Sequence, residues 1–335
     1  GLAATTVNTI QINNNEINGG LQRTDSLVPF YAVFNNTVNS LFTSINGNRF
    51  INHTVDVQKG PRYLVYNTAT SSSLTSLNGN QFNGCNYSDS LSTAFYGISN
   101  GGVFNGQLQM NGNTYSNTTV STKSASLHLI HNAALTGSTT TLVEMNTNSI
   151  TANTFSVGQN KPLYMIHQNG GIVSEVEMNS NVISTNAVIM PLGPLHMVFN
   201  EGPVSNSLTA NGNLLTQNTT TSNASGDVHG IFNLANGVQA LSISGNTVSA
   251  NKSSHVSGNT QLIHNAGFIS SAISLNNNTI GHIFDNPSQA YTGVFSGIWT
   301  SQSGTNTQIS ISGNTFSTLT FSSVAGLGPL YFIRN

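Results

Sequence analysis

Leu241-Ser242-Ile243-Ser244-Gly245-Asn246-Thr247-Val248 is the clearest copy of a motif that occurs ten times in this chain of 335 residues. The asparagine equivalent to Asn246 recurs at intervals of 32 to 36 residues. It stands at Asn15, Asn48, Asn80, Asn113, Asn148, Asn181, Asn213, Asn246, Asn278 and Asn314. A fixed period of this length is typical of a solenoid, in which each repeat stacks on the next.

Apolar and polar residues alternate around this asparagine. Leu241 and Ile243 lie two residues apart, Val248 follows the turn, and the residues between them are mostly polar. The same three positions are apolar in most of the other copies. Strict alternation with a period of two predicts a β-strand with one buried face. Apolar spacing of three and four, which would indicate a helix, is absent from the chain.

A second recurring segment follows each motif after a variable stretch rich in Ser, Thr, Asn and Gly, as in Leu163-Tyr164-Met165-Ile166-His167-Gln168. Its β-branched position is occupied by Val33, Val65, Ile98, Ile130, Ile166, Val198, Ile231, Ile263, Val294 and Ile333. Two residues later stand Asn35, Asn67, Asn100, Asn132, Gln168, Asn200, Asn233, Asn265, Ser296 and Asn335. This column of amides predicts an asparagine ladder, with side chains that bond to one another along the array.

We therefore predict an all-β fold: a single-chain parallel β-helix (β-solenoid) of about ten coils of ~33 residues, forming one domain over 1–335. Each coil should hold two firm strands and a looser third one. The motif at Ile311-Ser312-Gly313-Asn314-Thr315-Phe316 resembles coils of the right-handed parallel β-helix superfamily, which includes pectate lyases and bacterial surface passengers. The resemblance covers the whole chain. It implies the architecture and a right-handed coil, but no particular activity.

The composition narrows the functional classes. Charged residues make up only 5% of the chain and the net charge is −2, whereas ordinary soluble domains contain about 25% charged residues. A basic footprint for nucleic acid is missing, no apolar run is long enough to span a membrane, and no cofactor motif occurs. The chain starts at Gly1 rather than Met, which fits a removed signal peptide. We expect an extracellular or cell-surface protein.

The two ends of the chain complement each other. Segments 1–17 and 329–335 resemble two incomplete half-coils, and joining them across two copies gives a period of 36 residues, inside the observed range. Open solenoid ends favour open-ended head-to-tail contacts, which generate filaments. We predict a structural homo-oligomer whose interface contains Leu330, Tyr331, Phe332, Ile333 and Asn335 on one side and Ile10, Ile12, Asn15 and Ile17 on the other. The alternatives are an excerpt of a longer surface adhesin and, less favoured, a polysaccharide-acting enzyme.

Catalytic residues are not expected, although Glu144 and Glu177 share a column in adjacent coils. We interpret them as solvated glutamates on an outward face. His131 and His167 share another column, as do His196 and His229. Tyrosines and phenylalanines fill the same columns at Tyr31, Tyr63, Tyr96, Tyr164 and Tyr331, and at Phe34, Tyr66, Phe199, Phe232 and Phe295. With no acidic partner nearby in the sequence, the histidines are predicted to belong to an aromatic ladder and not to a metal site.

Two further properties are testable predictions. Protonation of paired, exposed histidines should loosen the array mildly near pH 5. Four Asn-X-Ser/Thr sequons fall at nearly one place in the variable stretch, namely Asn52, Asn117, Asn218 and Asn251. They are candidate glycosylation sites that would coat one face of the solenoid.

Overall fold

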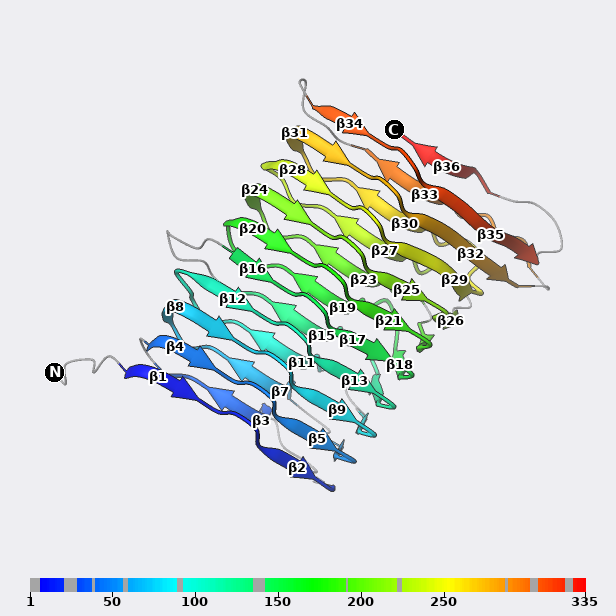
Figure 1. The fold of residues 1–335 in the computed structure, drawn as a ribbon. Coiled ribbons are helices and arrows are strands. Elements are labelled where there is room, and N and C mark those ends of the chain that lie inside the picture. Colours follow the sequence, from blue (N-terminus) through cyan, green and yellow to red (C-terminus); the bar gives the residue numbers. More distant parts are fainter. Residues whose placement is uncertain are drawn as a thin grey trace.

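The computed structural model of the chain describes residues 7–20, 29–37, 40–56, 60–88, 93–134, 142–190, 192–221, 225–286, 289–301, 307–322 and 328–335. The regular elements of these residues are β-strands, stacked coil upon coil from the N-terminal to the C-terminal end of the molecule (Figure 1). None of the described segments forms a helix of the length and apolar character needed to cross a membrane. The all-β prediction is confirmed.

The first sheet contains the strands that enter the asparagine motif. They are β1 (Val7–Gln11), β4 (Ser40–Ser44), β8 (Ser71–Ser76), β12 (Gln107–Gln109), β16 (Leu142–Glu144), β20 (Val173–Glu177), β24 (Val204–Thr209), β28 (Val238–Ser242), β31 (Ile269–Ser274) and β34 (Gln308–Ser310). Neighbours in this order pair in parallel, for example Leu208 with Leu241. Ten strands in one sheet correspond to nine full turns of the chain.

The second sheet follows the asparagine turn and has two legs. One leg contains β2 (Glu16–Asn18), β5 (Arg49–Ile51), β9 (Gln81–Asn83), β13 (Thr114–Ser116), β17 (Ser149–Thr151), β21 (Val182–Ser184), β25 (Leu214–Thr216), β29 (Thr247–Ser253), β32 (Thr279–Asp285) and β35 (Thr315–Ser322). The other contains β6 (Thr54–Asp56), β10 (Asn86–Ser88), β14 (Thr119–Thr122), β18 (Thr154–Val157), β22 (Ala187–Ile189), β26 (Thr219–Thr221) and the C-terminal parts of β29, β32 and β35. The variable stretch thus holds regular strands, where the sequence predicted only a loose one.

The third sheet contains the second recurring segment. Its strands are β3 (Phe30–Asn35), β7 (Arg62–Asn67), β11 (Phe95–Asn100), β15 (Leu127–Asn132), β19 (Leu163–Gln168), β23 (Leu195–Asn200), β27 (Val228–Asn233), β30 (Thr260–Asn265), β33 (Phe295–Thr300) and β36 (Leu330–Arg334). Together the three sheets form a parallel β-solenoid with a period of about 33 residues, as predicted.

The asparagine motif forms the turn between the first and second sheets. Asn246 accepts bonds on Oδ1 from the backbone N–H and the Nδ2 of Asn213, at 2.7 and 2.9 Å. Its own N–H and Nδ2 donate to Asn278 Oδ1 in the next coil. Gly245 before it has a φ of +67°, a left-handed conformation that glycine adopts without strain. The motif recurs because each turn needs this conformation and this amide.

The core lies between the three sheets and runs the length of the stack. Leu241, Ile243 and Val248 of the motif are buried in it, together with Ile263 of the third sheet. Leu241 pairs with Leu208, Val248 with Leu215 and Ile263 with Ile231 of the coil before, so the apolar columns predicted from the sequence are present. Burial of these columns is the main favourable term that holds the coils together.

The predicted register is wrong in one coil. In β33, Ile298 pairs with Ile263 and Thr300 with Asn265, whereas the sequence placed Val294 and Ser296 in those columns. The additional residues of this coil lie mainly between β32 and β33. Val294 and Ser296 repeat the spacing of a β-branched residue and a small polar one, which is why the pattern suggested them.

Candidate functional site

Each end of the solenoid presents one strand from every sheet. β1, β2 and β3 lie at the N-terminal end face, and β34, β35 and β36 lie at the C-terminal end face (Figure 1). The segments 1–17 and 329–335, expected to be half-coils, therefore belong to coils that reach all three sheets. Residues 1–6 of the first segment lie outside the described residues.

The C-terminal end face exposes apolar side chains. Leu330, Tyr331, Phe332 and Ile333 of β36 are between 37% and 53% exposed. Ile298, which pairs with Ile333 in the coil before, is fully buried. The two isoleucines occupy the same column, so the difference comes from position in the stack and not from residue type.

The core also reaches both end faces. Ile10, Ile12 and Ile17 are only partly buried at the N-terminal face. Ile311 and Phe316 are partly buried at the C-terminal face. The residues of the predicted interface therefore lie at opposite ends of the solenoid, and one copy of the chain does not bring them together. The apolar ones form two separate surfaces.

The asparagine ladder of the motif has a direction. From Asn15 to Asn278, each asparagine donates from its backbone N–H and from Nδ2 to Oδ1 of the asparagine in the next coil. Among the described residues, Asn15 Oδ1 thus ends the ladder as an acceptor and Asn314 ends it as a donor. Asn314 Nδ2 donates one proton back to Leu275 O at 2.7 Å, which leaves its second proton directed by the same pattern toward the end face.

The predicted ladder of the third sheet is confirmed in two parts. One part contains Asn35, Asn67, Asn100, Asn132 and Gln168, and the other contains Asn200, Asn233 and Asn265, with amide bonds of 2.7 to 3.1 Å. Between the parts, Gln168 Nε2 and Asn200 Oδ1 are buried with no hydrogen-bond partner among the described residues. Thr300 replaces the amide after Asn265, and membership of Asn335 stays a prediction.

The structure separates the four candidate glycosylation sites. Asn218 and Asn251 are buried in a third ladder that begins with Asn153 and Asn186. Asn218 Nδ2 donates to Asn251 Oδ1 and Ile183 O. A glycan on either buried amide requires opening the coil, so the prediction is wrong for these two residues. Asn52 and Asn117 lie one residue earlier in the turn and are exposed, and there the prediction stands untested.

Glu144 and Glu177 are in register in β16 and β20, as the sequence indicated. Each carboxylate accepts from neighbouring amides: Gln109 Nε2 lies 2.8 Å from Glu144 Oε2, and Asn146 Nδ2 lies 3.1 Å from Glu177 Oε2. Each carboxylate thus accepts from an amide of the coil before it. The arrangement is that of a hydrogen-bonded outward face.

An aromatic row runs along the third sheet. It consists of Tyr31, Phe34, Tyr63, Tyr66, Tyr96, His128, His131, Tyr164, His167, His196, Phe199, His229, Phe232, His264 and Trp299, with stacked rings 4 to 6 Å apart within a coil and between successive coils. The predicted aromatic ladder is thus present. Phe295 is not a member, because the register of β33 places Trp299 on His264.

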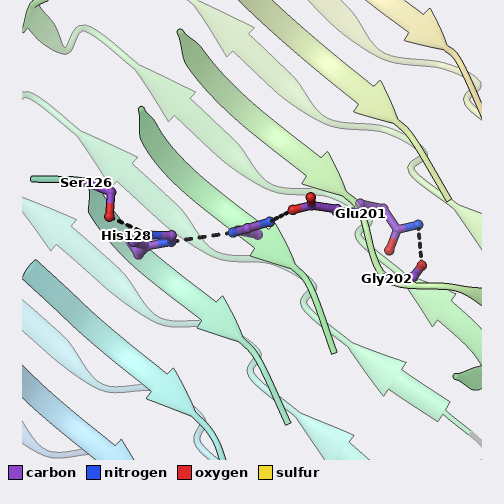
Figure 2. A network of polar contacts seen from close by, with 6 residues as sticks. Ser126, His128, Glu201 and Gly202 are labelled. Atoms are coloured by element: carbon purple, nitrogen blue, oxygen red, sulfur yellow. Dashed lines mark hydrogen bonds and ion pairs between the residues drawn. The ribbon is translucent and has the colours of Figure 1, made fainter. Parts of the chain in front are cut away.

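Within the row, His128, His131 and His167 form a histidine cluster. One nitrogen from each ring lies within 4.8 Å of one nitrogen from each of the others, and all three residues are buried. His128 Nδ1 and His167 Nδ1 are 3.4 Å apart. Figure 2 shows the polar chain that connects Ser126 through His128 to Glu201. The interpretation that these histidines lack an acidic partner is wrong, since Glu201 Oε2 lies 3.2 Å from His167 Nε2.

Burial keeps the cluster neutral. Desolvation lowers the pKa of His128 far below its usual value, and the nearby His131 and His167 lower it further. Desolvation, followed by the effect of His167, lowers the pKa of His131 to about 3. The pKa of His167 is also lowered by burial, although the hydrogen bond to Glu201 opposes the shift. Neutral imidazoles keep the lone pair that a proton would otherwise occupy.

An open pocket of about 580 Å³ lies beside the cluster, lined in part by His128, Lys161, Tyr164, His167 and Glu201. Sequence reasoning missed the site because Glu201 lies just after β23, outside the repeating columns. One signal was available: Glu201 follows His167 by 34 residues, close to one period. Comparison with family models, with curated proteins and with solved structures gave no match.

Proposed function

We propose that this protein is a non-catalytic structural subunit that stacks head to tail into an extracellular filament. In this arrangement β1, β2 and β3 of one copy pair with β34, β35 and β36 of another. The observation that carries the proposal is the direction of the motif ladder. One end face offers Asn15 Oδ1 as an acceptor, and the other offers the N–H groups of Asn314 as donors.

The aromatic row supports the same register. Stacking the two end faces as successive coils sets Tyr331 over Tyr31 and Arg334 over Phe34, because these residues occupy equivalent strand positions. The Arg334 guanidinium already lies 4.6 Å from the Trp299 ring and 4.9 Å from the Tyr331 ring. A second aromatic face on its other side adds a cation–π contact of about 0.5–2 kcal/mol.

The exposed apolar surfaces give the driving force. Phe332 and Ile333 at one end and Ile12 and Ile17 at the other leave water when a further coil covers them. Unpaired parallel strand edges are ready to pair with another chain. Ten coils at a spacing of ~4.8 Å predict an axial repeat of roughly 48 Å per subunit.

Electron microscopy of the purified chain tests the proposal. We expect unbranched fibres with the axial repeat given above, and their length should increase with protein concentration. Ile333→Asp should abolish them while leaving the monomer folded, because the side chain is 48% exposed. The matched control is Ile172→Asp, since Ile172 is 64% exposed but lies beside the stack, between β19 and β20. A monodisperse monomer at high concentration, or equal loss in both variants, would contradict the filament.

A further inference from the structure

We propose that the histidine cluster of His128, His131 and His167 is a binding site for one divalent transition-metal ion of the Zn²⁺ type. The site lies on the side of the solenoid, in β15 and β19, away from both end faces. It is therefore independent of filament formation. Three histidines from two adjacent coils supply the ligands.

Each histidine already has one nitrogen engaged. His128 Nε2 lies 3.1 Å from Ser126 Oγ, and His167 Nε2 lies 3.2 Å from Glu201 Oε2. His131 Nδ1 lies 3.4 Å from Ser99 Oγ. The other nitrogen of each ring is then left for an ion. Metal-bound histidines usually donate their second ring N–H to a carboxylate or another oxygen, which fixes the tautomer and the ring orientation.

The spacing of the free nitrogens fits a tetrahedral ion. Zn²⁺ binds imidazole nitrogen at about 2.0–2.1 Å, so two ligands at a tetrahedral angle are roughly 3.3–3.4 Å apart. His128 Nδ1 and His167 Nδ1 are 3.4 Å apart. One nitrogen of the His131 ring lies within 4.8 Å of one nitrogen of each of the other two rings, so rotation of the His131 ring would complete the set. In metal-free protein, His167 donates from Nε2 to Glu201, so the proton between His128 Nδ1 and His167 Nδ1 belongs to neutral His128. When the ion binds both Nδ1 atoms, this proton moves to His128 Nε2, which then donates to Ser126 Oγ.

Glu201 distinguishes this cluster from the other histidines of the row. It accepts a hydrogen bond from His167, and the bond lowers the pKa of the Glu201 carboxyl. His196 and His229 also stack, at 4.7 Å, but each has a buried Nδ1 without a hydrogen-bond partner among the described residues. Among the described residues, this pair belongs to no group of three possible metal ligands, so it lacks the third ligand.

The pocket borders two of the three proposed ligands. His128 and His167 line it together with Lys161, Asn169 and Ser124. An ion held by three histidines keeps one position for water or a small anion, and the Lys161 ammonium favours an anion there. The site thus belongs to the open three-histidine class and not to the closed structural class.

Titration of the metal-free protein with Zn²⁺, followed by calorimetry, tests the proposal. We expect one ion per chain with a submicromolar dissociation constant, and Co²⁺ should give the visible absorption of a tetrahedral site. His128→Tyr and His167→Phe should each weaken binding at least 100-fold. These replacements suit the row, because Tyr96 and Tyr164 flank His128 and Phe199 follows His167 in the same columns. His131→Phe gives a third, independent test if one variant does not fold.

The control and the second readout separate a metal site from unspecific binding. His229→Tyr changes the column of His128 two coils away from β19 and should leave the affinity unchanged. Glu201→Gln should weaken binding about 10-fold without changing the stoichiometry. The proposal is overturned if Zn²⁺ does not bind, if the stoichiometry is not one, or if His229→Tyr loses as much affinity as His128→Tyr.

Discussion

The central coils and the end coils are built from the same residues in different surroundings. Asn181 in the centre donates to Asn213 and accepts from Asn148, whereas Asn15 and Asn314 each have this ladder on one side only. The stability of this fold therefore comes from the contacts between coils and not from any one residue type. An end face carries the same kinds of residue as the contact between two central coils, and this likeness is the physical basis of the proposed stacking.

Acid should have the largest effect, and it should first open the coils that contain buried histidines. Burial lowers the pKa of His229 and His255 to about 4, and that of His264 and His282 to about 3. In the unfolded chain these groups bind protons below about pH 6.5, so folding loses stability as pH falls from 6.5 toward 4. Each buried histidine costs on the order of 2 kcal/mol at pH 4.5. The mild loosening predicted for exposed histidines becomes cooperative unfolding for buried ones.

Circular dichroism and hydrogen exchange between pH 7 and pH 4 measure this effect. Exchange should accelerate first in the coils that contain the buried histidines. His229→Phe and His264→Phe together should raise the stability at pH 4.5, because both Nδ1 atoms are buried without a partner among the described residues. If the pH midpoint of acid unfolding does not move in the double variant, the buried histidines are not the cause of the acid sensitivity.

Truncating two isoleucines of the β-branched column compares an interior coil with an end coil directly. Ile263→Ala should cost about 2–4 kcal/mol of unfolding free energy, because the side chain is fully buried and a cavity remains. Ile333→Ala should cost the monomer less than ~1 kcal/mol, since nearly half of the side chain is exposed. Urea denaturation of monomeric protein gives both values. The order should reverse for fibre formation, where Ile333→Ala weakens assembly more than its effect on monomer stability suggests.

The ladder allows the same comparison with polar groups. Asn181→Ala removes the acceptor of Asn148 N and Nδ2 and leaves both donors buried, at a cost of about 2–3 kcal/mol. Asn15→Ala removes one donor at an exposed end and should cost less than ~1 kcal/mol. Thermal unfolding of the two variants measures both losses of stability. Equal losses would mean that the amides contribute locally and not through the ladder.

The sequence was sufficient for the fold because the same requirement is repeated in every coil. A left-handed residue followed by a buried amide, as in Gly245-Asn246, has few other solutions. The register of β33 was not predictable from the column alone, because Val294 and Ser296 repeat the spacing that Ile298 and Thr300 satisfy. Only the packing of neighbouring coils distinguishes the two registers.

The candidate sites were predicted less completely. The repeat places apolar residues at both ends of the solenoid, so the exposure of Ile333 could be predicted from the sequence. The histidine cluster depends on Glu201, which lies in a loop, and on the contact of His128 with His167 across two different columns. A comparison of repeats by their period considers equivalent positions only. It therefore misses contacts between columns and between a loop and a strand.

The smallest predicted effect concerns the bend between the two legs of the second sheet. Gly19 occupies this bend in the first coil with a φ of +97°, and Ala152 occupies it in a central coil with a φ of +56°. Positive φ costs a non-glycine residue about 1–2 kcal/mol, and the stacked neighbours of Ala152 hold it there. Ala152→Asn should raise the unfolding free energy by about 0.5 kcal/mol, because asparagine tolerates this conformation better.

Gly19→Ala is the matched change at the end, since a Cβ there meets nothing within 4 Å and its effect is purely conformational. It should destabilise the first coil by about 1 kcal/mol, but hydrogen exchange should report the loss only in the N-terminal strands. If Ala152→Asn destabilises the protein, or if Gly19→Ala affects the central coils equally, strain is not confined to single coils. The central and end coils would then not differ in how they respond to backbone strain.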